Sequence, residues 1–445
     1  MTSRHHTIIQ PKFKGELFMQ QRTKIFILMV ISMVLGYLPW YNFSAVMNYI
    51  AKDFNLSSDQ TGMILSAFQM GYVIVVILSG WIADKVGDKK VVAWATLSTA
   101  VFSTAFTFFS SGFWSILVLR LLTGLSAGAI YVPGMALLSK WFPPKERGKV
   151  IGGYTGAMTL AYAGGYFIAG PLASNFGWQV GILFTSLPAF IAAYIVFFMV
   201  HEPEESTYEE STKQDAEESE SSYSNTDVKP APEGGYVGPS VITAGYMGHM
   251  WELYAFWGWI GPFMTASAFK VGYSSAEAVS LGNFLAALII VSGAPAVYVM
   301  GKIADKWGRS KTIFMCSIFS LVAQLFLGFL HGHSLVFVTL VGFWIGFWVV
   351  ADSGIYKAGL TEMVNFRLRS TMLGIQSAAG YLMTVVSPYV FGVVLDLQNN
   401  GADPMHAENW SLPFIILGLG AILAPISAII IRKTRQGSLM VNGKY

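Results

Sequence analysis

Two similar stretches of sequence decide the fold: GWIADKVGDKK at residues 80–90 and GKIADKWGRSK at residues 301–311. Both have glycine, aspartate and glycine at the same places, and each stands between two long apolar stretches. A second, shorter pair follows: ERG at residues 146–148 comes after the first stretch, and LRS at residues 368–370 comes after the second at nearly the same separation. A duplicated unit explains both matches. We therefore expect two halves with the same order of elements.

Apolar windows of membrane-spanning length surround these repeats. The chain of 445 residues is 54% hydrophobic and only 12% charged, against about 25% charged residues in an average soluble domain. A bilayer core of about 30 Å takes about 20 apolar residues per helix. Such windows lie near 25–50, 60–83, 91–110, 114–138, 149–172 and 178–200, then near 240–267, 276–300, 312–331, 335–361, 370–395 and 410–431. We expect an all-α membrane protein of twelve transmembrane helices in two pseudo-symmetric six-helix bundles, and not a soluble enzyme.

The segment between the two halves has a different composition. Residues 201–234 hold eleven acidic and two basic residues and few apolar ones. A chain of this composition cannot bury enough apolar surface to fold. The sequence therefore predicts a cytoplasmic segment at 1–24, an N-terminal bundle at 25–200, an acidic disordered cytoplasmic linker at 201–238, a C-terminal bundle at 239–431 and a cytoplasmic tail at 432–445.

The distribution of lysine and arginine predicts the orientation in the membrane. Of the 28 basic residues, 24 lie in the N-terminal segment, the linker, the tail and the loops on the same side as these. Basic loops stay in the cytoplasm. We therefore expect a multi-pass protein of the plasma membrane with both termini in the cytoplasm.

The paired loops resemble the Gly-x-x-x-Asp-x-x-Gly-basic signature of the major facilitator superfamily. The likeness extends over both repeats, the central linker and all twelve windows. The stretch RLLTGLSAG at residues 120–128 is similar to the Arg-Gly pattern of the fourth helix in that family, and HMWELY at residues 249–254 is similar to bacterial permeases for small anions. The resemblance implies a secondary transporter of a bacterial or archaeal inner membrane. It also implies that the first, fourth, seventh and tenth helices surround a central chamber.

The resemblance further implies that the paired loops act as conformational latches. Glycine permits tight turns, and an aspartate can cap a helix or pair with a nearby basic residue. The matching positions are Gly80, Asp84, Gly87, Lys89, Gly301, Asp305, Gly308 and Arg309. Asp88 departs from the pattern because an arginine is usual there. The alternative is that the basic residues of these loops only keep them on the cytoplasmic side.

Four charged residues stand inside the predicted spans: Arg120, Glu252, Asp352 and Lys357. A charge at mid-bilayer costs at least about 2.5 kcal/mol, so each is a candidate functional residue. We expect Arg120 and Lys357 to bind an anionic solute, although a structural role for Arg120 fits equally well. Glu252, or else Asp352, would take the coupling proton, because protonation of a buried carboxyl group responds to burial and to neighbouring charges. Glu252 is also the expected partner of Lys357.

Polar and aromatic residues near these charges are further candidate solute contacts. They are Tyr41, Asn42, His249 and Tyr254. Trp40 and Trp257 belong to the same aromatic groups, which are suited to wall an organic solute. Anchoring at the membrane interface or contact with lipid is the alternative for the aromatic side chains, and hydrogen-bonded packing is the alternative for His249.

Together these features predict a proton-coupled symporter for a small organic anion. The sequence carries no phosphate-binding loop or ATPase signature, so uphill transport must use an ion gradient. We expect a monomer in the lipid bilayer, with no cofactor, no metal site and no nucleic-acid partner. Two alternatives are an exporter of larger amphiphilic compounds and a transporter-like solute sensor that signals through its linker without turnover. Deletion of residues 204–230 would abolish a sensor's output but leave uptake by a transporter.

Overall fold

The computed structural model describes residues 11–203, 235–365 and 368–443, and all regular elements within these ranges are helical. The predicted linker at 201–238 lies almost entirely outside the described residues. The first half contains α1 (Pro11–Tyr37), α2 (Asn42–Phe54), α3 (Ser58–Val86), α4 (Asp88–Phe109), α5 (Phe113–Ala127), α6 (Tyr131–Trp141), α7 (Pro144–Phe176), α8 (Trp178–Ser186), α9 (Pro188–Tyr194) and η1 (Ile195–Met199). The second half contains α11 (Val237–Lys270), α12 (Ser275–Ser292), α13 (Ala296–Trp307), α14 (Arg309–Leu327), η2 (Gly328–Leu330), α15 (Leu335–Ala351), α16 (Ser353–Met363), α17 (Arg369–Asn399), α18 (Ser411–Ala421), α19 (Leu423–Ile431) and η4 (Gly437–Gly443).

Some of the predicted windows are single helices and others are broken in the middle. Within the described residues, ten helical segments are long and apolar enough to cross a membrane. The other two windows correspond to α7, which begins with a charged turn, and to α11, which is rich in Gly, Trp and Tyr. These residues lower the mean hydropathy of helices that are long enough to span a bilayer. The predicted all-helical membrane fold is confirmed.

The two halves repeat each other element by element. In the fourth span α5 is followed by a short break and then by α6, and in the tenth span α15 is followed by a short break and then by α16. α6 and α16 are each 11 residues long. The fourth and tenth spans are therefore interrupted at the same place, by residues 128–130 in one half and by Asp352 in the other. The first span is interrupted at residues 38–41, where Pro39 has no backbone N–H to continue a helix.

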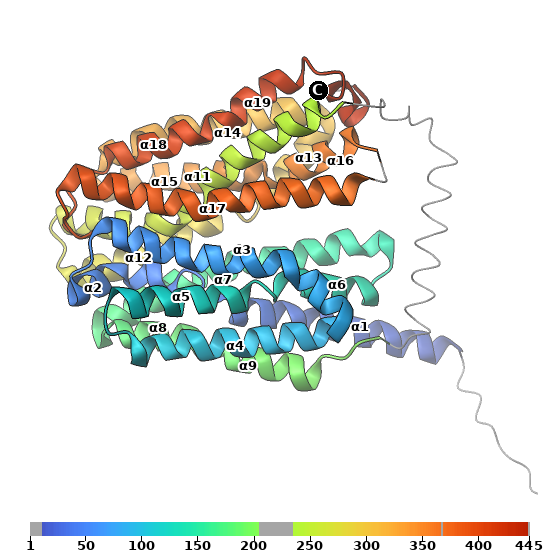
Figure 1. The fold of residues 1–445 in the computed structure, drawn as a ribbon, viewed down its shortest axis with the longest axis horizontal. Coiled ribbons are helices and arrows are strands. Elements are labelled where there is room, and N and C mark those ends of the chain that lie inside the picture. The colour runs from blue at the N-terminus through green and yellow to red at the C-terminus, as the bar shows by residue number, and fades with distance from the viewer. Residues whose placement is uncertain (1–10, 204–234, 366–367, 444–445) are drawn as a thin grey trace, which may run out of the picture.

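The halves form two groups of helices that meet along their inner faces (Figure 1). α3 packs against α17, and α7 packs against α12. At the end distant from the described chain termini, hydrogen bonds join the halves. The Ser58 N–H donates to Asp396 Oδ1 at 3.2 Å, and Asn283 Nδ2 donates to the Ala45 carbonyl at 2.8 Å. This end, predicted to face the cell exterior, is closed.

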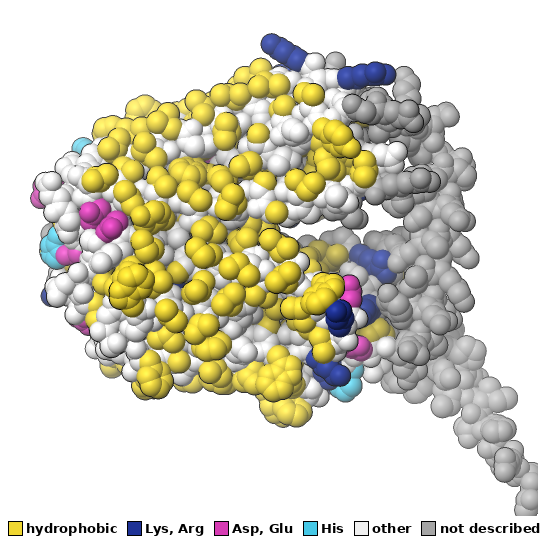
Figure 2. Space-filling model, in the orientation of Figure 1, with side chains coloured by type: hydrophobic (Ala, Val, Ile, Leu, Met, Phe, Trp, Pro, Cys, Tyr) yellow, Lys and Arg dark blue, Asp and Glu magenta, His cyan; other side chains and the backbone are white. Residues whose placement is uncertain are grey.

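The opposite end is open. Figure 2 shows a slot between the two halves at the end where Figure 1 labels α6 and α16, and hydrophobic side chains over most of the lateral surface of both groups. Charged side chains gather at the two ends of that surface. An apolar lateral belt is what a bilayer requires. The conformation therefore opens toward the side predicted to be cytoplasmic.

Candidate functional site

Three polar side chains meet at the break of the tenth span. Asp352 lies between α15 and α16, and His249 lies near the middle of α11. His249 Nδ1 is 2.9 Å from Asp352 Oδ1, and His249 Nε2 is 2.8 Å from Ser353 Oγ. His249 and Asp352 are each only 2% exposed. Both ring nitrogens are thus engaged by side chains of the break, which gives the His249–Asp352 pair a fixed geometry.

Glu252 lies one turn along α11 from His249. Three residues of separation place the two side chains on the same face of the helix. Glu252 is 2% exposed, and its Oε1 accepts a hydrogen bond from Ser320 on α14 at 2.5 Å. The described residues place no cation beside this carboxylate, so a negative charge on it is only partly compensated by one neutral hydroxyl.

Lys357 points elsewhere. It lies on α16, five residues beyond Asp352 and therefore about 140° around the helix. Its side chain is exposed, and it forms no hydrogen bond or ion pair with the described residues. The expected pairing of Lys357 with Glu252 is therefore absent in this conformation, because Glu252 is buried against α14. Lys357 offers a cation that is free to bind an anion.

Arg120 supports the break in the first span. Its guanidinium donates to the Pro39 carbonyl at 3.0 Å, to the Trp40 carbonyl at 2.9 Å and to Asn42 Oδ1 at 3.3 Å. The same group lies 4.4 Å from the ring centre of Phe68, and Arg120 is 2% exposed. Residues in a helix break leave carbonyls without helical partners, and Arg120 satisfies two of them. Of the two roles expected for Arg120, solute binding and structural support, these contacts are of the structural kind.

The other predicted solute contacts lie in two different settings. Asn42 Nδ2 donates to Thr185 Oγ1 at 3.0 Å, so its side chain is occupied within the first half. Tyr41 and Tyr254 come from different halves and both lie against Trp257, with ring centres 6.5 and 5.7 Å away. Tyr41 and Tyr254 are therefore brought together where the halves meet, whereas Asn42 belongs to the support of the first span.

The first latch loop is held by an ion pair. Asp88 begins α4, and its Oδ2 lies 2.7 Å from Nζ of Lys140, near the end of α6. The Lys89 N–H donates to Glu202 Oε1 at 3.2 Å. Lys85, in contrast, lies on the ring of Trp81. The unusual aspartate at position 88 thus has a basic partner on the fourth span.

The second latch loop contains the same pair with opposite charges. Arg309 begins α14, and its guanidinium lies 2.8 Å from Glu362 Oε1, near the end of α16. It also lies 2.6 Å from Asp305 Oδ1. The other Glu362 oxygen accepts from the Val441 N–H at 3.0 Å.

The two pairs occupy equivalent positions in the repeat. Asp88 and Arg309 each directly follow the turn glycine of their loop and begin the next helix. Lys140 and Glu362 are each the last residue but one of α6 and α16. Both latch loops are therefore tied to the second helix of the fourth or tenth span by an ion pair at the same place.

The latch glycines play two different parts. Gly87 and Gly308 have φ values of +95° and +109°, in a region that favours glycine, and each forms the turn between two helices. Gly80 and Gly301 have no neighbouring heavy atom within 4 Å of where a Cβ would stand. The turn therefore requires the second glycine of each motif. Close packing in this conformation does not explain why Gly80 and Gly301, the first glycines, are glycine.

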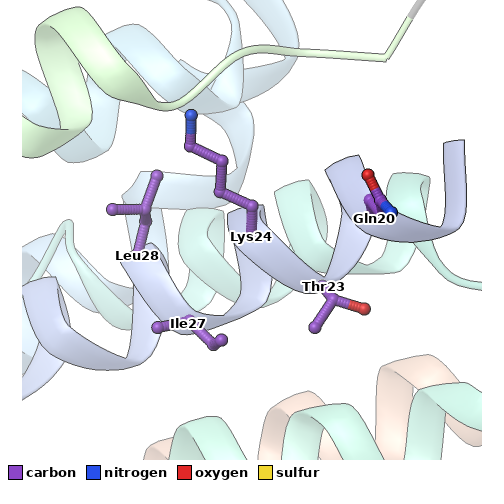
Figure 3. A pocket seen from close by; sticks show the side chains of 5 residues that line it. All are labelled: Gln20, Thr23, Lys24, Ile27 and Leu28. Atoms are coloured by element: carbon purple, nitrogen blue, oxygen red, sulfur yellow. The ribbon is translucent and has the colours of Figure 1, made fainter. Parts of the chain in front are cut away.

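A separate hollow lies on the first helix (Figure 3). It has a volume of about 560 Å³, and the described residues that line it are Gln20, Thr23, Lys24, Ile27 and Leu28 of α1. Figure 3 shows Lys24 pointing away from the axis of α1.

Sequence reasoning found the charged members of the site but not their partners. Ser320 and Ser353 carry no signal in sequence, because a serine in a helix has many possible roles. Lys140 and Glu362 could have been found, since the repeat aligns them with each other as it aligns Asp88 with Arg309.

Comparison with known proteins places the chain among transporters. A hexuronate transporter of Bacillus subtilis (strain 168) is 30% identical over 203 residues, which cover 46% of this chain and 48% of that protein. That match therefore spans about half the length of the relative. A cis,cis-muconate transport protein of Acinetobacter baylyi is 23% identical over 394 residues, which cover 88% of this chain and 89% of that protein.

A solved structure shares the fold, and a family model identifies the family. A bacterial homologue of the human lysosomal transporter Spinster, in an inward-facing and occupied conformation, has a TM-score of 0.73 at 15% identity, covering 93% of this chain and 97% of that one. The fold is therefore shared. The family model of the Major Facilitator Superfamily matches residues 29–351. The relatives are transporters and not enzymes. Because the match covers more than half of the sequence, the chain belongs to the major facilitator superfamily.

Proposed function

We propose that the protein carries a small organic anion across the membrane together with a proton, by alternating access. Membership of a transporter family supports the general activity. The relatives named for hexuronate and muconate support an organic anion as the solute. Rocking of two bundles about a site near the midplane is the mechanism typical of inverted and parallel repeats in transporters.

The His249–Asp352 pair is the observation that carries the proton-coupled part of this proposal. Neutral imidazole has one donor and one acceptor nitrogen, whereas protonated imidazole has two donors. A neutral ring donates from Nδ1 to Asp352 and accepts at Nε2 from the Ser353 hydroxyl. A protonated ring donates at both positions, and the Ser353 hydroxyl only has to rotate. Both states keep both hydrogen bonds, so the pair can gain and lose a proton without losing its structure.

Charge balance links this proton to the solute. With neutral His249, the pair has a net charge of −1, and Glu252 one turn away adds to it when ionised. A proton on His249 makes the pair neutral, which lowers the repulsion between this region and an incoming anion. Lys357 lies on the next turn of α16 and is exposed. We assign it the initial attraction of the anion through water, and Arg120 the support of the first span.

Alternating access requires the closed end to open. Ser58 and Asp396, together with Asn283 and Ala45, must separate for solute to leave toward the other side. These are neutral or singly charged hydrogen bonds, each worth about 0.5–3 kcal/mol. Contacts of this strength allow a reversible transition between two conformations.

Uptake into proteoliposomes tests the proposal. Purified full-length protein is reconstituted, and entry of a labelled hexuronate or cis,cis-muconate is followed with and without an inward proton gradient. We expect accumulation with the gradient, and its loss when a protonophore removes the gradient. Equal uptake in both conditions would contradict proton coupling. Uptake of neither acid, with either sign of the gradient, would contradict the organic-anion assignment.

A further inference from the structure

Four aromatic side chains form a cluster where the halves meet, and we call them the donor cluster: Trp40, Tyr41, Tyr162 and Trp257. Trp40 and Tyr41 lie in the break of the first span, Tyr162 on α7 and Trp257 on α11. The ring centre of Tyr162 is 4.9 Å from Trp40, 5.3 Å from Tyr41 and 5.4 Å from Trp257. Both halves thus contribute to one compact group of rings.

The polar atoms of the donor cluster are buried without partners. The four residues are 1–4% exposed. The indole nitrogens of Trp40 and Trp257 and the hydroxyls of Tyr41 and Tyr162 form no well-aligned hydrogen bond with the described residues, although the Tyr41 hydroxyl lies near the Trp40 indole and the Tyr254 hydroxyl lies near that of Tyr162. A buried polar group left unsatisfied loses its hydrogen bonds to water without replacement. Four such groups in one cluster require an explanation such as a bound molecule.

Nearby residues of the same types do have partners. The Tyr37 hydroxyl donates to the Ala127 carbonyl at 3.0 Å, and Trp259 Nε1 donates to the Pro388 carbonyl at 3.0 Å. Both residues are at most 1% exposed. Deep burial in this fold therefore leaves some tyrosine hydroxyls with an acceptor and others, those of Tyr72 and Tyr356, without one. What distinguishes the donor cluster is that four unpartnered polar atoms belong to one group of contacting rings.

The cluster offers four donors. An indole N–H can only donate, and a phenol hydroxyl can donate as well as accept. The main-chain carbonyls of Pro39 and Trp40, in the same break, are already bound by Arg120. The same guanidinium brings a positive charge directly behind Trp40. A group with several acceptors and a negative charge is complementary to this arrangement.

We propose that the donor cluster binds the carboxylate of the transported acid through neutral N–H and O–H groups. A carboxylate has two oxygens and about four acceptor positions, which equals the number of donors in the cluster. The carbon body of the acid would pack on the ring faces, as organic ligands do in aromatic-lined sites. This assignment rests on the proposed function, and it adds the residues that select a carboxylic acid.

The location also explains why occupancy would affect conformation. Tyr162 belongs to the first half and Trp257 to the second, so a carboxylate bound by both would join the halves. The Tyr166 hydroxyl already donates to the Trp257 carbonyl at 2.6 Å, which fixes this part of α11 against α7. The ligand would thus contact both halves at a point that is already ordered.

Substitutions that remove single donors test the assignment. Tyr41→Phe and Tyr162→Phe delete only a hydroxyl, and Trp40→Phe and Trp257→Phe delete the indole N–H but keep an aromatic ring. Tyr37→Phe and Trp259→Phe are matched controls, because they remove donors that already have partners. Binding of a hexuronate, of cis,cis-muconate and of the methyl esters of both acids is measured by calorimetry on purified full-length protein.

We expect wild-type protein to prefer the free acid over its ester, and Tyr41→Phe and Tyr162→Phe each to weaken acid binding about fivefold or more. Ester binding should change less, so that the preference for the acid falls. The controls should keep that preference even where they lower thermal stability. Acid affinities within about twofold of wild type in all four donor variants would overturn the assignment and leave anion transport intact. Failure of wild type to bind either acid would overturn the proposed function as well.

Discussion

The two halves of this transporter share a backbone plan but differ in where they keep their charges. At the break of the fourth span stand residues 128–130, GAI, and at the equivalent break of the tenth span stands Asp352, paired with His249. The first half uses the buried Arg120 to support a helix break. Duplication therefore placed the helices alike, while the titratable pair at the break belongs to the second half.

The latch loops differ in another way. Asp88 with Lys140, and Arg309 with Glu362, occupy equivalent positions with reversed signs. Where the charge of the loop residue has the opposite sign, the charge of its partner has the opposite sign too, so the loop and the span attract each other in both halves. The comparison indicates that pairing matters at this position and that the sign of each charge does not.

The largest effect is expected from Asp352→Asn. This substitution removes the carboxylate that distinguishes the break of the tenth span from that of the fourth span. The amide still accepts a hydrogen bond from His249 Nδ1, but it no longer stabilises a protonated imidazole. Gradient-driven uptake should fall by roughly tenfold or more, because a protonated His249 without a carboxylate partner would be an uncompensated charge in the membrane, which costs several kcal/mol. Solute exchange without a gradient should fall much less. Equal losses in both assays would mean that the variant is simply misfolded or unable to bind.

Arg120→Ala should act on stability and not on coupling. It leaves the Pro39 and Trp40 carbonyls without donors, at a cost of roughly 2–5 kcal/mol. Arg120→Lys should recover only part of this loss, because an ammonium group lacks the planar fork that reaches separate acceptors. Thermal unfolding in detergent measures both. A variant with wild-type stability and no affinity for the acid would instead favour direct solute contact by Arg120.

A moderate effect is expected from charge reversal at the latches. Lys140→Glu places two carboxylates together and should slow transport by roughly threefold to fivefold, the scale of a partly exposed pair. Adding Asp88→Lys restores the pair with reversed signs and should recover the rate. In the second half, Arg309→Glu with Glu362→Arg should recover less, because Asp305 and the Val441 N–H also bind there. Equal recovery of the transport rate in the two double variants would contradict this expected difference between the latch loops.

The smallest effect is expected from Lys357→Met. Its exposed ammonium attracts the anion through water, so the apparent affinity should fall by roughly threefold at low salt and less at high salt. Lys302→Met is the control, because Lys302 lies on the ring of Tyr298 instead. A loss with Lys357→Met that does not depend on salt would indicate direct contact with the solute.

Much of the fold could be predicted from sequence, because apolar windows and the repeat are local or periodic signals. The turn at Gly87 followed from the motif, and so did the equivalent turn at Gly308. The pairing of His249 with Asp352 could not be predicted. It depends on the rotation of α11 and α16 about their own axes, which is set by packing between distant segments. The same is true of Arg120, whose acceptors exist only because the first span is broken at Pro39.

Proton movement measured beside solute movement tests the central claim most directly. Proteoliposomes with wild-type protein are supplied with the transported acid in weakly buffered medium, and the external pH is recorded. The account predicts alkalinisation that follows solute entry in wild type and is absent in Asp352→Asn, although this variant still exchanges labelled acid. Alkalinisation in Asp352→Asn in the wild-type ratio to solute would contradict a coupling proton carried by the His249–Asp352 pair.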